Sequence, residues 1–109
     1  MSSELSIREE YLDESVKVFI EGEIDIYTAQ KFKEKLYEVI DRSGKDVRIN
    51  CKGLNYIDST GLGIFVGALK KTKLGGREIY LEKLRENIKK LFLITGLDKL
   101  FIINTEEAE

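Results

Sequence analysis

The sequence predicts an α/β fold in which a mixed β-sheet of four to five strands carries helices mainly on one face. Short segments such as 16–20 alternate apolar and charged side chains, which is the period of a half-buried strand. Longer segments such as 60–73 space apolar residues three and four positions apart, as in an amphipathic helix. In chain order the segments read β-β-α-β-α-β-α-β, an initial hairpin followed by crossover units, and right-handed crossovers favour one face for the helices.

The first two strands are predicted at 4–12 and 16–22, where apolar side chains alternate with polar ones. Asp13-Glu14-Ser15 lies between them and supplies turn residues, so the two strands form a hairpin. Gly22 is predicted to end the second strand.

The first helix follows that break. Asp25 is a suitable N-cap, and Gly44 is suited to the left-handed conformation that ends many helices. The apolar face predicted for this helix consists of Ala29, Phe32, Leu36, Val39 and Ile40.

The centre of the chain is the junction at 57–64, where a strand pattern gives way to a helix pattern. The third strand is predicted at 47–51, and the central helix at 60–73 with Leu62, Phe65, Val66 and Leu69 on one face. Asp58-Ser59-Thr60 lies between them, and all three residue types favour helix starts. A serine hydroxyl is therefore predicted at the positive end of a helix, beside a carboxylate.

The last third of the chain is predicted to hold two short strands and a helix. Gly75-Gly76 makes a turn into a strand at 79–81. A helix over 85–94 places Ile88, Leu91 and Phe92 on one face and stops at Gly96. A closing strand is predicted at 100–103, and residues 105–109 form an acidic tail that we expect to fray.

Composition limits the chain to one domain over residues 1–109, because 109 residues with 42% hydrophobic side chains support a single core. The chain contains no histidine, which removes the commonest general base and the commonest metal ligand. We therefore expect neither an enzyme nor a metal or other cofactor. The single cysteine, Cys51, lies in an alternating apolar run and is interpreted as a small buried residue.

The charge pattern argues against nucleic-acid binding, since a net charge of −2 provides no overall basic field. Lys70, Lys71 and Lys73 are interpreted as a solvated helix end. The longest apolar runs are far shorter than the roughly 18 residues of a membrane span, and the first residues lack the pattern of a signal peptide. We therefore expect a cytoplasmic protein without a membrane segment.

The glycines of the central helix match neither common phosphate-binding loop, because their spacing is G-x-G-x-x-x-G. Gly63 and Gly67 are one turn apart, so we expect a strip without side chains that packs closely against a neighbouring element. Considered by itself, Ser59 is interpreted as the helix N-cap, worth about 1 kcal/mol.

Three blocks of sequence change that interpretation. Gly22-Glu23-Ile24-Asp25 precedes a helix, Tyr56-Ile57-Asp58-Ser59-Thr60-Gly61-Leu62-Gly63 joins a strand to a helix, and Phe92-Leu93-Ile94-Thr95-Gly96-Leu97 lies near the end. In this order they resemble the bacterial anti-sigma factor antagonists of the STAS-domain family, over nearly the whole chain. The resemblance implies a single STAS-like domain.

The resemblance also implies a function and its residues. Such antagonists bind an anti-sigma factor that is also a serine kinase, which frees the sigma factor, and phosphorylation of the antagonist ends the interaction. A phosphatase would reverse it. Ser59 matches the phosphorylated serine, with Thr60 as the second candidate. The partner-binding residues predicted in this way are Glu23, Asp25, Tyr27, Thr28, Asp58, Thr60, Gly61 and Leu62.

The alternative within the same family is a stressosome-type subunit or another signalling module that binds a ligand or nucleotide at the helix start. Simple electrostatics favours the phosphorylation switch. A phosphoserine adds about −1.5 to −2 charges, which a helix N-terminus tolerates but a neighbouring carboxylate and a fitted interface do not. We therefore expect phosphorylation to change binding without changing the fold.

Overall fold

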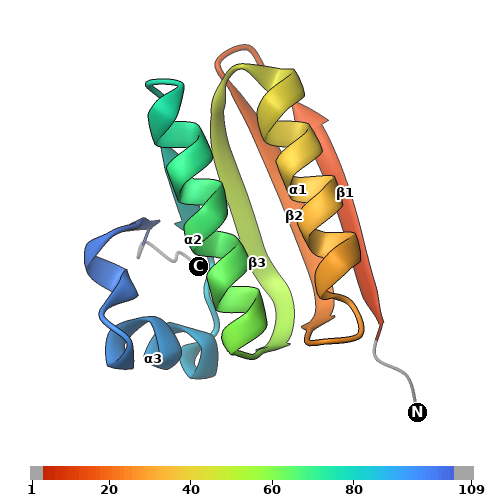
Figure 1. Ribbon diagram of the computed structural model, residues 1–109, viewed down its shortest axis with the longest axis vertical. Helices are drawn as coiled ribbons and strands as arrows, with labels where there is room; N and C mark the ends of the chain where they lie inside the picture. The colour runs from red at the N-terminus through yellow and green to blue at the C-terminus, as the bar shows by residue number, and fades with distance from the viewer. Residues whose placement is uncertain (1–3, 105–109) are drawn as a thin grey trace.

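Five strands form one sheet in chain order, from β1 at one edge to β5 at the other, in a computed structural model that describes residues 4–104 (Figure 1). β1 runs antiparallel to β2, and the remaining neighbours are parallel. The strands are β1 (Leu5–Tyr11), β2 (Ser15–Ile24), β3 (Asp46–Ile57), β4 (Ile79–Glu82) and β5 (Ile102–Asn104). The helices are α1 (Ala29–Ser43), α2 (Ser59–Leu74), α3 (Glu86–Ile94) and the 3-10 helix η1 (Leu97–Lys99).

The predicted class and element order are confirmed. Each parallel pair is joined through a helix, and every crossover moves one strand further in the same direction, so right-handed connections place the helices on one face. Figure 1 shows α1 and α2 side by side on the sheet, with both helix starts at the end where α3 lies. The carboxyl ends of the parallel strands therefore meet the helix starts at one end of the molecule.

The core lies between the sheet and the helices. Phe32 of α1, Phe65 of α2, Phe92 of α3 and the following Phe101 form one aromatic cluster, with ring centroids of neighbouring pairs 5.3–6.3 Å apart. Cys51 is fully buried in this core as predicted, and burial raises the pKa of its thiol to about 12.

The face of the sheet opposite α1 and α2 carries the polar half of the alternation, and no helix within residues 4–104 covers it (Figure 1). Arg48 of β3 pairs there with Glu82 of β4 at 2.6 Å, and its guanidinium lies 5.1 Å from the Tyr80 ring. The pairing explains how Glu82 can be buried on this face.

Two strand boundaries predicted from the sequence are wrong. Gly22 does not end β2, because the strand continues to Ile24. The φ of Gly22 is 118°, and a Cβ at this position would clash with the carbonyl oxygen of Glu4, so only glycine lets the strand pass here. β3 does not end at Cys51 but runs to Ile57, because the pairing with β2 resumes after an irregular step at Gly53. The alternation of apolar and polar side chains stops at that step, although the strand itself continues.

Smaller differences occur in the last third. α3 begins at Glu86, one residue later than predicted. The closing strand comprises Ile102–Asn104 and follows the 3-10 turn η1, which the sequence analysis did not predict. Gly44 and Gly96 adopt the left-handed conformation, with φ of 63° and 77°. The tail predicted at 105–109 lies outside the described residues.

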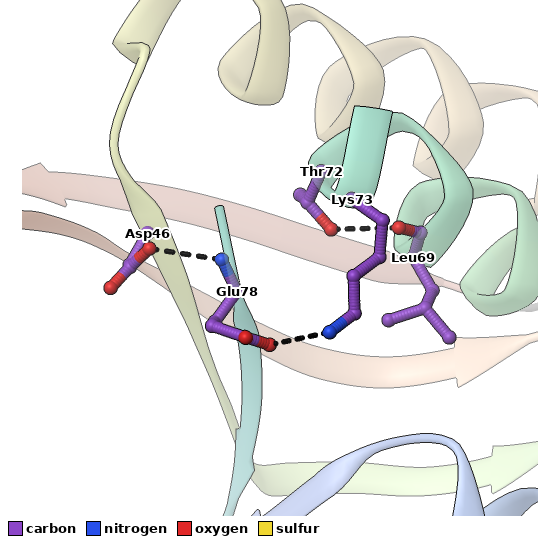
Figure 2. A network of polar contacts seen from close by, with 5 residues as sticks. All are labelled: Asp46, Leu69, Thr72, Lys73 and Glu78. Atoms are coloured by element: carbon purple, nitrogen blue, oxygen red, sulfur yellow. Dashed lines mark hydrogen bonds and ion pairs between the residues drawn. The ribbon is translucent and has the colours of Figure 1, made fainter. Parts of the chain in front are cut away.

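The end of the sheet opposite the helix starts is held by polar contacts (Figure 2). The Asp46 carboxylate accepts a hydrogen bond from the Glu78 backbone N–H at 2.9 Å, and the Glu78 carboxylate pairs with Lys73 at 3.0 Å. Lys71 pairs with Asp41. Two of the three clustered lysines at the end of α2 thus contribute to local ion pairs. No helix within residues 4–104 is long and apolar enough to cross a membrane.

The predicted glycine strip is only half correct. A Cβ on Gly63 would meet nothing within 4 Å, so this glycine faces open space, whereas a Cβ on Gly67 would clash with the hydroxyl of Tyr37. That hydroxyl donates a hydrogen bond to the Ile64 carbonyl at 3.3 Å, and burial raises the pKa of the Tyr37 phenol. Gly67 therefore leaves room for a side chain that joins α1 to α2.

We expect Gly63→Ala to raise the free energy of unfolding by about 0.5–1 kcal/mol, because it replaces glycine in an open helical position. Gly67→Ala should gain less or lose stability, because the new methyl group displaces Tyr37. Urea unfolding of the two variants measures the difference. In a Tyr37→Ala background Gly67→Ala should recover the full gain, and failure to do so would contradict this account of the glycine.

Candidate functional site

The β2–α1 turn at residues 25–28 and the start of α2 lie side by side at one end of the sheet. Ile24 of β2 is paired with Ile57 of β3, and the backbone N–H of Asp58 donates to the carbonyl of Ile24 at 3.2 Å. Two segments more than thirty residues apart in sequence are thus joined by a backbone hydrogen bond. This juxtaposition is the candidate site.

Asp58 is the N-cap of α2. Its backbone is extended, its carboxylate accepts a hydrogen bond from the N–H of Gly61 at 3.1 Å, and its carbonyl accepts from Leu62 at 3.0 Å. The interpretation of Ser59 as the N-cap is therefore wrong, because Ser59 already belongs to the helix as its first residue. The carboxylate one position earlier takes the capping role.

Ser59 is exposed. Among residues 4–104, no side chain or backbone group forms a hydrogen bond with its hydroxyl. Thr60 is exposed as well. The site therefore presents a hydroxyl that the fold does not use, directly beside the capping carboxylate.

The turn at 25–28 is closed by its own polar side chains. The Asp25 carboxylate accepts hydrogen bonds from the N–H groups of Tyr27 at 2.9 Å and Thr28 at 3.2 Å. The Thr28 hydroxyl donates to the carbonyl of Glu23 at 2.7 Å and accepts from the N–H of Asp25 at 3.0 Å. Asp25 was predicted to cap α1, but the helix begins at Ala29 with Thr28 in the cap position, so Asp25 closes the preceding turn instead.

The predicted partner-binding residues occupy three kinds of position. Tyr27 and Thr60 are exposed, and Tyr27 retains 76% of its accessible surface. The carboxylates of the site are half-buried: Glu23, Asp25 and Asp58. The remaining residues are buried and can support the site but offer little surface to a partner: Thr28, Gly61 and Leu62.

Gly61 shows why a glycine follows Asp58-Ser59-Thr60. A Cβ at this position would lie 2.6 Å from the Ile57 side chain and 2.7 Å from the Ile24 side chain. The first turn of α2 thus rests directly on the ends of β2 and β3, which fixes the position of Ser59.

The pattern that characterises the STAS domain matches residues 7–109, a range that includes both the 25–28 turn and the start of α2. The chain belongs to the STAS-domain family. Relatives of this STAS domain include the anti-sigma-B factor antagonist of Bacillus subtilis (strain 168), which is 43% identical over 94 residues, covering 86% of this chain and 85% of the relative. The anti-sigma-B factor antagonist of Listeria monocytogenes is 39% identical over 109 residues, covering 100% of this chain and 95% of the relative.

Solved structures share the fold of this STAS domain. An anti-sigma factor antagonist from Mycobacterium paratuberculosis superposes with a TM-score of 0.79 at 24% identity, over 94% of this chain and 86% of that one. The antagonist SpoIIAA in its unphosphorylated form gives a TM-score of 0.75 at 23% identity, over 93% of this chain and 90% of that one.

Sequence reasoning missed two exposed apolar residues beside the site of this STAS domain. Ile26 is 69% exposed at the tip of the turn, and Tyr56, just before the α2 junction, is 49% exposed. Two apolar residues in succession, Ile26-Tyr27, within an otherwise polar turn were the available signal. Exposed aromatic and aliphatic side chains beside carboxylates are typical of protein-binding surfaces.

We expect Asp58→Ala to lower the free energy of unfolding by about 1 kcal/mol, because the N–H of Gly61 loses its acceptor. Asp58→Asn retains an acceptor at the cap and should cost less. Ser59→Ala should stay within about 0.5 kcal/mol of the parent, because its hydroxyl is not needed by the fold. Chemical denaturation of the three variants is the measurement, and an equal loss in Ser59→Ala and Asp58→Ala would contradict the assignment of the cap.

Proposed function

We propose that this STAS domain is an anti-sigma factor antagonist that is inactivated by phosphorylation of Ser59. It binds an anti-sigma factor with serine kinase activity, and this binding releases a sigma factor. Phosphoryl transfer to Ser59 ends the interaction, and a protein phosphatase restores it. The protein acts by binding and has no catalytic role of its own. The observation that carries the proposal is the exposed Ser59 hydroxyl, which forms no hydrogen bond with any group in residues 4–104.

Exposed apolar side chains and nearby carboxylates support the proposed docking surface. The exposed side chains of Ile26 and Tyr27 in the 25–28 turn, and of Tyr56 just before the α2 junction, provide apolar area at the same end of the sheet as Ser59. Glu23 and Asp58 add negative charge, which favours a basic surface on the kinase and accelerates association. Asp25 contributes by closing the turn that presents Tyr27.

The fold can accept a phosphate on Ser59. The residue is the first of α2, where the helix dipole and the N–H groups of the first turn favour negative charge. The phosphate would nevertheless lie next to the Asp58 carboxylate on a surface that suits a neutral hydroxyl. Charge repulsion and the added bulk then separate the partners without unfolding the domain.

Incubation with ATP and the cognate anti-sigma kinase, followed by peptide mass spectrometry, tests the proposal. We expect one phosphate, carried by the peptide that contains Ser59. Thr60→Ala should be phosphorylated at the rate of the parent, whereas Ser59→Ala should not be phosphorylated. Phosphate on Thr60, or on a serine outside the 57–64 junction, would overturn the assignment of the acceptor.

A further inference from the structure

A groove opens on the polar face of the sheet, opposite α1 and α2 and away from Ser59. Phe19 of β2 is paired with Asn50 of β3, but the next paired residues are Glu21 and Gly53, so β3 contains one extra residue. Such a β-bulge bends the strand and redirects its side chains. Gly53 has no side chain, and a Cβ there would lie 2.6 Å from the Glu21 side chain. A groove of about 470 Å³ lies at this bulge.

Cations from three different elements line this groove: Arg8 of β1, Lys52 of β3 and Arg85 at the start of α3. Two of them are held in place by the fold. The Arg8 guanidinium lies 4.1 Å from the centroid of the Phe19 ring, and Nε of Arg85 donates to the Lys52 carbonyl at 2.8 Å. Both guanidinium groups keep further N–H donors for a ligand.

A second groove of about 520 Å³ shares Arg85 and adds Lys83 and Lys89. Within residues 4–104, none of these five cations forms an ion pair with a carboxylate. Arg48 on the same face of the sheet behaves differently, because Glu82 neutralises it at 2.6 Å. The two grooves therefore share Arg85, and both are lined by cations that form no ion pair within residues 4–104, in a protein whose net charge is −2.

We propose that these two grooves bind an acidic peptide segment of a partner protein. Carboxylates of the segment would pair with Arg8, Lys52 and Arg85, and apolar side chains between them would contact Phe19 and Leu84, which also line the grooves. The proposal is independent of the phosphorylation of Ser59, because the groove of Arg8 and Phe19 lies on the opposite face of the sheet from α2.

The same features disfavour a nucleic acid. Glu21 and Glu86 also line the grooves, and a strand with a phosphate at every nucleotide would meet both, whereas a peptide can place neutral side chains opposite them.

Fluorescence anisotropy with the full chain tests the proposal. The probe is a short fluorescein-labelled peptide in which pairs of glutamates alternate with leucine, and the control is the same peptide with glutamine in place of glutamate. We expect the acidic peptide to bind and the control not to bind. Arg85→Glu should weaken binding by roughly tenfold, and Lys70→Glu, an equal charge change on the exposed part of α2, by less than about twofold. Amide NMR shifts should move at Phe19 and Gly53 but not at Ser59.

Lys83→Gly provides a second variant that should keep the fold, because Lys83 has a φ of 56°, a conformation that glycine adopts readily. It should also weaken peptide binding. Equal binding of the glutamine peptide, or equal losses in Arg85→Glu and Lys70→Glu, would overturn the proposal. Tighter binding of a thymidine oligonucleotide at the same residues would assign the grooves to nucleic acid instead. If the acidic peptide binds only after glutamine replaces Glu106, Glu107 and Glu109, the grooves would be assigned to the chain's own acidic residues instead.

Discussion

Ser59→Asp is expected to bind the anti-sigma kinase roughly a hundredfold more weakly than the parent, and phosphorylated protein at least as weakly. A like-charge contact in an interface costs several kcal/mol, and each 1.4 kcal/mol changes the dissociation constant about tenfold. The new carboxylate would lie beside Asp58, where the parent presents the uncharged hydroxyl of Ser59. Titration of the kinase with each variant by calorimetry or anisotropy is the measurement.

Two controls separate charge from shape. Ser59→Asn has nearly the same size as Ser59→Asp without the charge, and it should bind within about tenfold of the parent if charge dominates. Ser59→Ala should bind like the parent and resist inactivation by ATP. Thermal melts should remain close to the parent in all three, since Asp58 rather than Ser59 caps α2. If Ser59→Asn binds as weakly as Ser59→Asp, steric fit and not charge repulsion controls the switch.

Phe65→Ala is expected to lower the free energy of unfolding by about 3–5 kcal/mol, the range for removing a large buried aromatic side chain. Phe65 is fully buried, and its ring lies 5.3 Å from that of Phe32, 5.8 Å from Phe92 and 6.3 Å from Phe101. Its removal would leave a cavity where α1, α2 and α3 meet. Because small domains are stable by only about 5–15 kcal/mol, the variant should be partly unfolded at moderate urea concentrations.

Phe65→Leu is the matched control, because it preserves most of the volume and should cost under about 2 kcal/mol. Urea denaturation followed by circular dichroism measures both variants. A loss of less than about 1 kcal/mol in Phe65→Ala would mean that the remaining rings collapse into the cavity. The aromatic cluster would then contribute less to stability than its central position implies.

The sequence by itself determined the fold class, the order of the elements and most of the core. These depend on hydrophobic period, which is a local property: Val16, Val18 and Ile20 repeat every second residue, and the apolar face of α1 repeats with helical spacing. All five residues predicted for that face are buried. The motif around Ser59 was recognisable for the same reason, since its residues are adjacent in the chain.

Only the tertiary structure decided which residues of that motif are available to a partner. Asp58 rather than Ser59 caps α2 because the backbone of Asp58 extends the β3 pairing, with its N–H bonded to Ile24 of the neighbouring strand. Gly61 rather than Gly63 lies against the core because the helix rests on Ile24 and Ile57. The bulge at Gly53 and the groove beside it likewise depend on the register between two strands. Such features arise from pairing between distant segments. The hydrophobic period determines which face of a strand is buried, but it does not identify the residue opposite each position or the place of a bulge.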